Sequence, residues 1–198
     1  MPEAKRIVLF CEDDEHEAFV RELVRRLCKE IDLPYSLSAP SARGGHPQAL
    51  AALRAWQKSL NQLGGAPDLL VVLIDANCKG WGQVRQDLVT SVDAERIPNA
   101  VIGCPDPHLE RWLIADPAAF QEVVGTTAGA DPGKCDRTFY KELLARRIAA
   151  GTEVVITGPR DLIPDIIESM DLFQAGKRQP SLKHFIDDLS QAIKRLAV

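Results

Sequence analysis

The stretch Asp68-Leu-Leu-Val-Val-Leu-Ile-Asp75 decides the fold class of this chain. Only apolar residues stand between the two acids, without the alternation expected of a strand that has one face in water. Such a run predicts a strand buried on both faces, as in a parallel sheet covered by helices. The preceding Gly64-Gly65-Ala66-Pro67 supplies the break before the strand.

The segments around this strand alternate between strand and helix patterns. Short apolar runs predict strands at Arg6–Cys11 and Ala100–Cys104 and a weaker one at Tyr35–Ala42. Apolar residues at helical spacing predict a helix after each strand and several more towards the C-terminus. These helices are expected to carry Phe19–Leu27, Leu50–Leu60, Trp81–Val92, His108–Ala115, Thr138–Ala150, Asp161–Met170 and Ser181–Leu196.

This order of elements predicts an α/β fold in which a mainly parallel open sheet is flanked by helices. The strands end before residue 117, and the rest of the chain is loop and helix. We therefore expect residues 1–117 to form an α/β metal-binding core and residues 118–198 to form a helical C-terminal cap packed on it. A chain of 198 residues is long enough to bury such a core without cross-links.

Charge and cysteine content narrow the class of protein. The net charge is −4 and the pI about 5.6, so no global basic excess indicates nucleic-acid binding, although a local patch remains possible. The N-terminus lacks the apolar region of a signal peptide, and no apolar run could span a bilayer, which predicts a cytoplasmic protein without a membrane contact. Five cysteines without a C-x-x-C pair predict free thiols in that compartment.

Acidic residues follow three of the predicted strands. Glu12 follows the first, Asp75 the central one, and Glu110 comes a turn after the last. Because parallel strands end at the same edge of a sheet, these carboxylates are expected to lie close together, where a divalent cation would offset their repulsion. Oxygen ligands of this kind suit Mg²⁺ or Mn²⁺.

Simpler roles exist for each of these groups. Asp14, with Glu17 three residues on, resembles a helix-capping pair. Glu110 could simply be an acid in the first turn of a helix, where it interacts favourably with the helix dipole. Asp75 could be a turn residue, and His108 is expected at the surface. An alternative soft metal site would use cysteines at the strand ends, and a base could stack on an exposed tryptophan. The residues concerned are Cys11, Cys78, Cys104 and His108 for the metal, and Trp81 for stacking.

Two known families match parts of this pattern. The first strand and helix, with Asp13 and Asp14, and the run ending in Asp75 resemble response-regulator receiver domains, which implies Asp75 as a phosphoacceptor. The gap between the two segments is longer than in receivers, and the expected loop after Asp75 and strand-end lysine are missing.

The chain resembles more closely the Toprim-like proteins, in particular those related to RloB and OLD-type nucleases. The resemblance rests on Glu12 after the first strand, on Asp75-Ala-Asn77 where the family has Asp-x-Asp, and on two later motifs. These are Glu110-Arg-Trp-Leu-Ile-Ala-Asp116 and Ser181-Leu-Lys-His-Phe185. Relatives often belong to prokaryotic anti-phage loci beside an ATPase.

The Toprim resemblance implies a nuclease, a divalent-metal-dependent phosphodiester hydrolase of anti-phage defence or repair. Glu12, Asp75 and Glu110 would be catalytic, and the same residues with Asn77 would hold Mg²⁺ or Mn²⁺. The implied phosphate contacts are Arg43, Lys79, Lys134 and Lys141. Because Asn77 replaces an acid, the first alternative is a catalytically degenerate subunit that binds an ATPase partner. The second alternative is a receiver-like phosphoacceptor domain. The expected partners are nucleic acid, an ATPase and, as an open option, a second copy of the chain.

Overall fold

The fold is an α/β architecture built on one open parallel sheet, as the sequence predicts. The computed structural model describes residues 3–40, 46–129, 131–136, 138–151 and 159–198. The strands are β1 (Lys5–Cys11), β2 (Tyr35–Ser38), β3 (Leu69–Leu73) and β4 (Ala100–Gly103), and all pairs are parallel. Their order in the sheet is β2-β1-β3-β4, with β3 in the interior.

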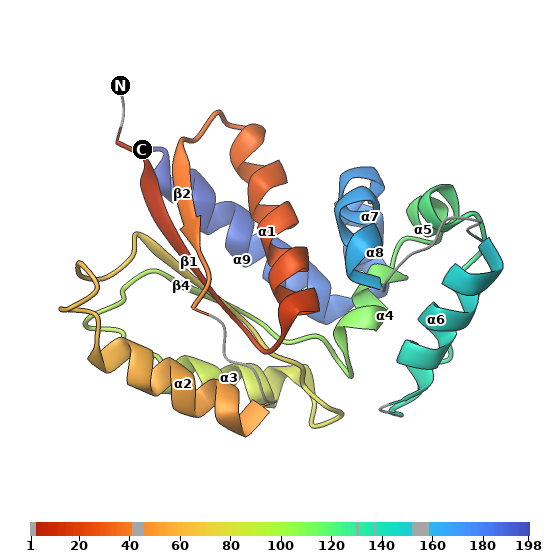
Figure 1. Ribbon diagram of the computed structural model, residues 1–198, viewed down its shortest axis with the longest axis horizontal. Coiled ribbons are helices and arrows are strands. Elements are labelled where there is room, and N and C mark those ends of the chain that lie inside the picture. The colour runs from red at the N-terminus through yellow and green to blue at the C-terminus, as the bar shows by residue number, and fades with distance from the viewer. Residues whose placement is uncertain (1–2, 41–45, 130, 137, 152–158) are drawn as a thin grey trace.

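Helices cover both faces of the sheet (Figure 1). One face carries α1 (Asp14–Lys29) and α9 (Pro180–Leu196), and the other carries α2 (His46–Lys58) and α3 (Trp81–Ser91). The alternate residues of β3 divide between two apolar cores, with Leu73 in the first and Val72 in the second. All five residues of β3 are buried, which explains why its sequence shows no alternation.

In the structure we use the word cap for the helices between β4 and α9, which are seen on the right of Figure 1. It consists of α4 (Leu109–Leu113), α5 (Pro117–Val124), α6 (Phe139–Gly151), a 3-10 turn (Pro159–Leu162), α7 (Ile163–Ser169) and α8 (Leu172–Arg178). The last helix, α9, returns to the sheet, so both ends of the chain lie at the same end of the molecule (Figure 1). Among the residues that the structure describes, no helix is long and apolar enough to cross a membrane.

Two short helices were missing from the sequence expectation. No helix is expected between Ala115 and Thr138, but the Asp116 carboxylate accepts hydrogen bonds from the N–H groups of Ala118 and Ala119, with Pro117 at the first turn. This is a helix start. Likewise Asp171 caps α8. The weak strand at Tyr35–Ala42 is also shorter than expected, since β2 ends at Ser38.

Trp112 joins the cap to the core. Its indole is fully buried, lies 5.6 Å from the rings of both Phe19 and Phe185, and donates a hydrogen bond to Ser181 Oγ at 2.9 Å. The two later motifs of the sequence therefore meet in one cluster. A buried aromatic with a satisfied N–H is a strong packing centre.

The cysteines differ from the sequence expectation in one pair. Cys11, Cys28 and Cys104 are buried free thiols, as expected. Cys78 and Cys135, 57 residues apart, form a disulfide, so the prediction of five free thiols is wrong for these two. Burial raises the pKa of the Cys28 thiol to about 11 and that of Cys104 to about 12, which keeps both neutral.

β3, β4 and α9 approach one another closely at Gly103, and a substitution there can test this packing. A Cβ at this position would lie 2.5 Å from Leu73 Cδ1 and 2.7 Å from Phe185 Cδ2. We expect Gly103→Ala to lower the free energy of unfolding by about 1–3 kcal/mol, as overpacking does. Gly82→Ala is the matched control, because a Cβ there meets nothing within 4 Å and α3 favours alanine over glycine. Urea unfolding of both variants would show equal effects if Gly103 were not tightly packed.

Candidate metal centre

The acidic residues meet where the strand order changes direction. β2 lies on one side of β1, and β3 and β4 lie on the other, so the crevice beyond the ends of β1 and β3 is the usual ligand position of an open α/β sheet. Cys11 pairs with Leu73 in the register, which places Glu12 and Asp75 as neighbours just beyond the strands. Glu12 Oε2 accepts a hydrogen bond from the Asp75 backbone N–H at 3.1 Å.

His16 lies between two carboxylates in the first turn of α1. The Asp13 side chain caps this helix by accepting from the N–H groups of Glu15 and His16, so Asp13 is the cap and the expectation of Asp14 is wrong. His16 Nδ1 lies 2.7 Å from Asp13 Oδ1, and Nε2 lies 2.9 Å from Asp75 Oδ1. Each ring nitrogen therefore donates a proton, and His16 is an imidazolium.

The charges of this group are strongly coupled. Although burial opposes it, the attraction of Asp75 and the hydrogen bonds to Asp13 and Asp75 raise the pKa of His16 well above its usual value. The same contacts lower the pKa of Asp13 and Asp75 against the effect of burial. Burial and the nearby Asp75 charge raise the pKa of Glu12. Glu12 is thus the acid that the positive charge of His16 compensates least.

Asp75 receives donors from three directions. Besides His16, the Leu109 backbone N–H donates to Oδ1 at 3.0 Å and His108 Nδ1 donates to Oδ2 at 2.9 Å. The residue is only 7% exposed, so it is a buried, hydrogen-bonded carboxylate and not a turn residue at the surface. Its backbone carbonyl accepts the Asn77 amide N–H at 3.2 Å.

Glu12, His16 and Asp75 form a group that could hold a metal ion. Each offers one ligand atom, and these atoms lie within 4.8 Å of one another. Two carboxylate oxygens and one imidazole nitrogen are a ligand set that several divalent cations accept. A cluster that could hold a metal ion is thus present at the strand ends. It shares Glu12 and Asp75 with the expected ligands, but its third member is His16 and not Asn77 or Glu110.

The other two expected ligands, Glu110 and Asn77, are not part of the group that could hold a metal ion among the described residues. Glu110 is 3% exposed and forms an ion pair with Lys141, Nζ to Oε1 at 3.5 Å. Burial and the Glu110 charge together raise the pKa of Glu15, which shows that the two acids face each other. Asn77 uses its amide nitrogen on the backbone of Asp75 and adopts a left-handed backbone with φ of 49°.

The expected phosphate contacts differ in their surroundings. Lys79 and Lys134 are exposed, Lys134 Nζ lies 5.1 Å above the Phe139 ring, and Lys141 pairs with Glu110. Arg43 lies outside the described residues. Lys141 also interacts with the charges of Glu15, Asp13 and Asp75, so its ammonium faces the acids.

Two histidines of the site were missed or misplaced by the sequence reading. His16 was not assigned a role, although its position only four residues after Glu12, at the start of the predicted helix, is the signal that could have found it. The surface expectation for His108 is wrong, because it is 3% exposed and bonded to Asp75. Its Nε2 atom is buried without a hydrogen-bond partner among the described residues.

The alternative sites find little support. Cys78 is bonded to Cys135 and is not a free thiol for a soft metal. Trp81 is half-buried, with its ring 5.4 Å from that of His184.

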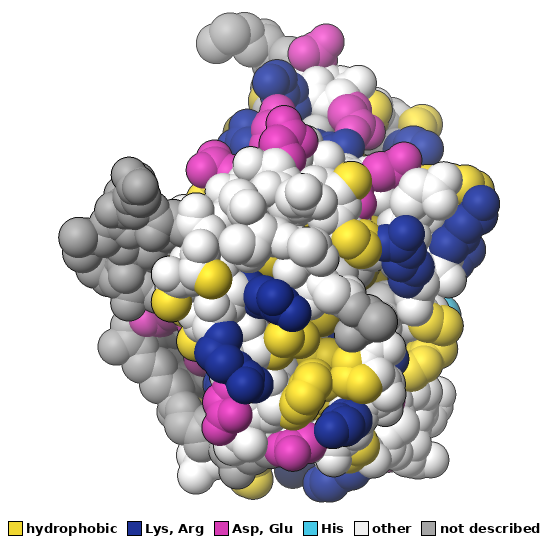
Figure 2. Space-filling view, turned by 90° about the vertical axis from the view of Figure 1, so that its right-hand side faces the viewer, with side chains coloured by type: hydrophobic (Ala, Val, Ile, Leu, Met, Phe, Trp, Pro, Cys, Tyr) yellow, Lys and Arg dark blue, Asp and Glu magenta, His cyan; other side chains and the backbone are white. Residues whose placement is uncertain are grey.

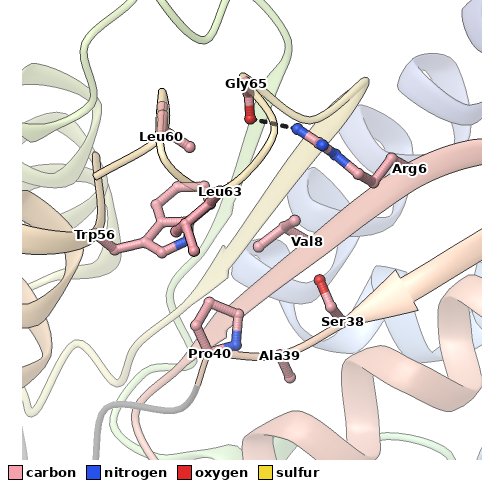
Figure 3. Close-up of a pocket in the computed structure, with 9 residues that line it drawn as sticks. All are labelled: Arg6, Val8, Ser38, Ala39, Pro40, Trp56, Leu60, Leu63 and Gly65. Carbon is pink, nitrogen blue, oxygen red and sulfur yellow. Dashed lines mark hydrogen bonds between the residues drawn. The ribbon is translucent and has the colours of Figure 1, made fainter. Parts of the chain in front are cut away.

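A cavity of about 300 Å³ opens beside α2, away from the residues of the metal centre. Figure 3 shows Trp56, Leu63, Val8 and Pro40 around it, with Arg6 donating to the Gly65 carbonyl at its rim. None of the described residues that line it is acidic or a histidine.

Comparison with known proteins places the chain in a family. Residues 11–190 match a family model described as a domain of unknown function, DUF4276. The chain belongs to the DUF4276 family. No curated protein and no solved structure gives a significant match. The family match spans the metal-capable group of this DUF4276 protein and most of its cap, and its description states no activity.

Because His16 is charged, we expect its contribution to the stability of the metal-free protein to depend on pH. His16→Gln leaves the buried Asp75 without its charged partner, so we expect a loss of about 3 kcal/mol in the free energy of unfolding. The groups facing His16 are Glu12, Asp13, Glu15 and Asp75. Because the folded pKa is raised, its contribution is complete below about pH 6.5 and is lost as the pH rises through the folded value. Urea unfolding in a chelator at pH 6 and pH 9 measures this.

The wild type should therefore exceed His16→Gln by more at pH 6 than at pH 9. His184→Gln is the control histidine, with a partly exposed ring outside the group. An advantage of the wild type that stayed constant across this range would contradict a charged His16.

Proposed function

We propose that this DUF4276 protein is a divalent-metal-dependent phosphodiester hydrolase acting on nucleic acid, as the resemblance to Toprim-like nucleases implies. The observation that carries the proposal is the convergence of Glu12, His16 and Asp75 within 4.8 Å at the switch point of the sheet. A role in anti-phage defence or repair and a cytoplasmic location belong to the same proposal.

The residues present fit a divalent cation. Burial and the Asp75 charge together raise the pKa of Glu12, so its ionised form is unfavourable in the metal-free site, and a cation would stabilise it. The imidazole in the set favours Mn²⁺ over Mg²⁺, which prefers oxygen ligands alone. When bound, the metal would supply charge to a phosphate oxygen and lower the pKa of a bound water.

The surrounding side chains have separate tasks in this proposal. Glu12 and Asp75 supply carboxylate oxygens, and Asp13 orients the His16 ring through Nδ1. His108 and the Leu109 N–H hold the Asp75 carboxylate in place. Such outer partners fix the orientation of metal ligands. Lys141 offers the cation nearest to the acids for a phosphate oxygen.

The cap supports binding of an anionic chain only locally. Figure 2 views the cap end of the molecule, where Lys and Arg side chains are scattered among apolar and acidic ones without one continuous basic face. We therefore propose that phosphate recognition is confined to the rim, with Lys79, Lys134 and Lys141 as its cations. A short single strand suits such a small set of contacts better than a long duplex.

Two observations favour the alternative, a degenerate subunit that binds an ATPase partner. Asn77 replaces an acid and turns its amide to the backbone, and Glu110 is neutralised by Lys141. The receiver-like alternative has less support. A buried Asp75 with three hydrogen-bond donors is a poor nucleophile towards a phosphodonor.

Metal binding and stability should change in opposite directions in Glu12→Gln. Because the folded pKa of Glu12 is raised, its ionised form costs stability above about pH 5, so the glutamine variant should unfold at higher urea concentration in a chelator at pH 7. The Gln side-chain oxygen can still accept from Asp75 N–H. Calorimetry with Mn²⁺ should show binding by the wild type and none by the variant.

Glu142→Gln, an exposed change in α6, is the control and should alter neither quantity. A Glu12→Gln protein that bound Mn²⁺ as tightly as the wild type would remove this carboxylate from the metal site. No Mn²⁺ binding by the wild type would sink the autonomous hydrolase and leave the degenerate subunit.

The activity itself is tested by incubating labelled single-stranded DNA and RNA with the protein and Mn²⁺. We expect cleavage that a chelator stops and that falls more than about 100-fold in Glu12→Gln and Asp75→Asn, since removing even a group that supports a ligand costs up to that factor. Lys141→Met should weaken cleavage and Lys141→Arg should restore part of it. Cleavage that survived in Glu12→Gln would point to a contaminating nuclease.

A further inference from the structure

The Cys78–Cys135 disulfide joins the metal centre to the cap. Cys78 lies three residues after Asp75, and Cys135 lies six residues before Lys141, whose ammonium faces the acids. The bond therefore connects the loop that follows β3 with the segment that leads into α6. The two bonded cysteines are 57 residues apart in the sequence.

The bonded cysteines differ from the other three in their access to solvent. Cys78 and Cys135 are exposed, whereas Cys11, Cys28 and Cys104 are at most 2% exposed. Only the exposed pair can meet a thiol or disulfide reagent in the folded protein. Redox chemistry of this chain is therefore confined to the bond beside the site.

The loop on the metal-centre side has a conformation that needs support. Asn77 and Cys78 have φ of 49° and 67°, and Gly80 has φ of 82°. Side-chain-bearing residues rarely adopt this left-handed region, and they persist there when surrounding contacts hold them. The disulfide is one such contact, and the hydrogen bond from the Asn77 N–H to the Pro107 carbonyl at 3.0 Å is another, so opening the disulfide should let the Cys78 end of the loop relax.

On the cap side, the segment 131–136 is held by Asp131 at its start, by the Lys134 ammonium 5.1 Å from the centroid of the Phe139 ring, and by the disulfide at Cys135. Asp131 accepts hydrogen bonds from Arg111, Tyr140 and Gln179, which fixes the start of the segment 131–136. Cys135 fixes its other end through the disulfide. Lys134 lies between the two anchors, and Lys79 follows Cys78, so each lysine is one residue from a bonded cysteine.

We propose that the Cys78–Cys135 disulfide is a redox-responsive latch that holds Lys79 and Lys134 together as a phosphate-binding pair at the rim of the metal centre. The Cα atoms of the cysteines are 5.6 Å apart, so the bond keeps the backbones of the two adjacent lysines close to each other. The assignment of the pair to nucleic-acid phosphates rests on the proposed function. Opening the latch frees both lysines without disturbing the Asp131 anchor or the buried cores.

The chemistry is thiol–disulfide exchange with a small disulfide such as oxidised glutathione. The Cys135 thiolate attacks a glutathione sulfur, which breaks that S–S bond, forms a mixed disulfide and releases one glutathione thiolate. The Cys78 thiolate then attacks the Cys135 sulfur and releases the second. Two cysteine thiols lose two protons and two electrons, and the oxidant gains them. A dithiol reductant reverses both steps.

The first test asks whether the latch exists and moves. After treatment with oxidised glutathione, denaturation and alkylation, mass spectrometry should find three modified cysteines, against five in reduced protein. Backbone hydrogen exchange should then be faster in the reduced form within residues 76–80 and 131–136 and unchanged in β1 and β3. Five modified cysteines after oxidation, or equal exchange in both forms, would overturn the proposal.

The second test measures phosphate binding with a fluorescent oligothymidylate in a chelator, so that no cleavage occurs. We expect roughly three- to tenfold weaker binding on reduction, as the ordered pair is lost. Cys135→Ser should bind like the reduced protein with or without reductant, and Lys134→Met should remove most of the redox effect. Equal binding in both redox states would overturn the phosphate pair even where Mn²⁺-dependent cleavage stands. If neither state binds the probe, the nucleic-acid function fails, and hydrogen exchange alone decides whether the latch exists.

Discussion

The buried carboxylate of Asp75 is the constraint on which the metal centre depends. A charge taken out of water needs partners, and here they come from α1, through His16, and from the start of α4, through His108 and the Leu109 N–H. These contacts tie β3 to one helix of the core and to the first helix of the cap. The start of α1 is fixed in turn by Asp13, which both caps the helix and orients the imidazole. Packing around Trp112 then holds the cap against α1 and α9.

The charges of the centre can be balanced in two ways, by a proton or by a metal. Without a metal, the single positive charge of His16 faces Glu12, Asp13 and Asp75, which leaves two negative charges uncompensated when all three acids are ionised. A divalent cation that displaced the His16 proton would leave one. Metal binding would therefore be linked to proton release.

The sequence predicts the parts of this structure that depend on local pattern and on sheet topology. The unbroken run before Asp75 gives a central parallel strand, and Glu12 follows the strand that pairs with it, so their proximity follows from the fold class. His16 could have been added, since it follows Glu12 by only four residues. Long-range placements were beyond reach. Glu110 and Lys141 meet because α6 packs beside α4, and Cys78 meets Cys135 across 57 residues, neither of which any periodicity records. Short helices such as α5 leave too few residues for an apolar pattern, and only Asp116-Pro117 marks its start.

The positions of Asn77 and Glu110 bear on which kind of phosphodiester chemistry the proposed function would use. Toprim-like nucleases, by the resemblance, would gather several acids around their metal. Here Asn77 shapes the loop by bonding to the Asp75 carbonyl, and Glu110 holds Lys141 instead of standing free. One position of the implied acidic set is thus a neutral amide here, and the acid at another position is already paired with a cation. The arrangement favours one metal ion accompanied by a lysine ammonium over two metal ions. A lysine is a compact, mobile charge that suits a phosphate oxygen but cannot activate a water as a metal does. Under the proposed function, the hydrolysis would therefore rest on the Glu12, His16 and Asp75 group, and the cap would contribute the cations that bind the substrate.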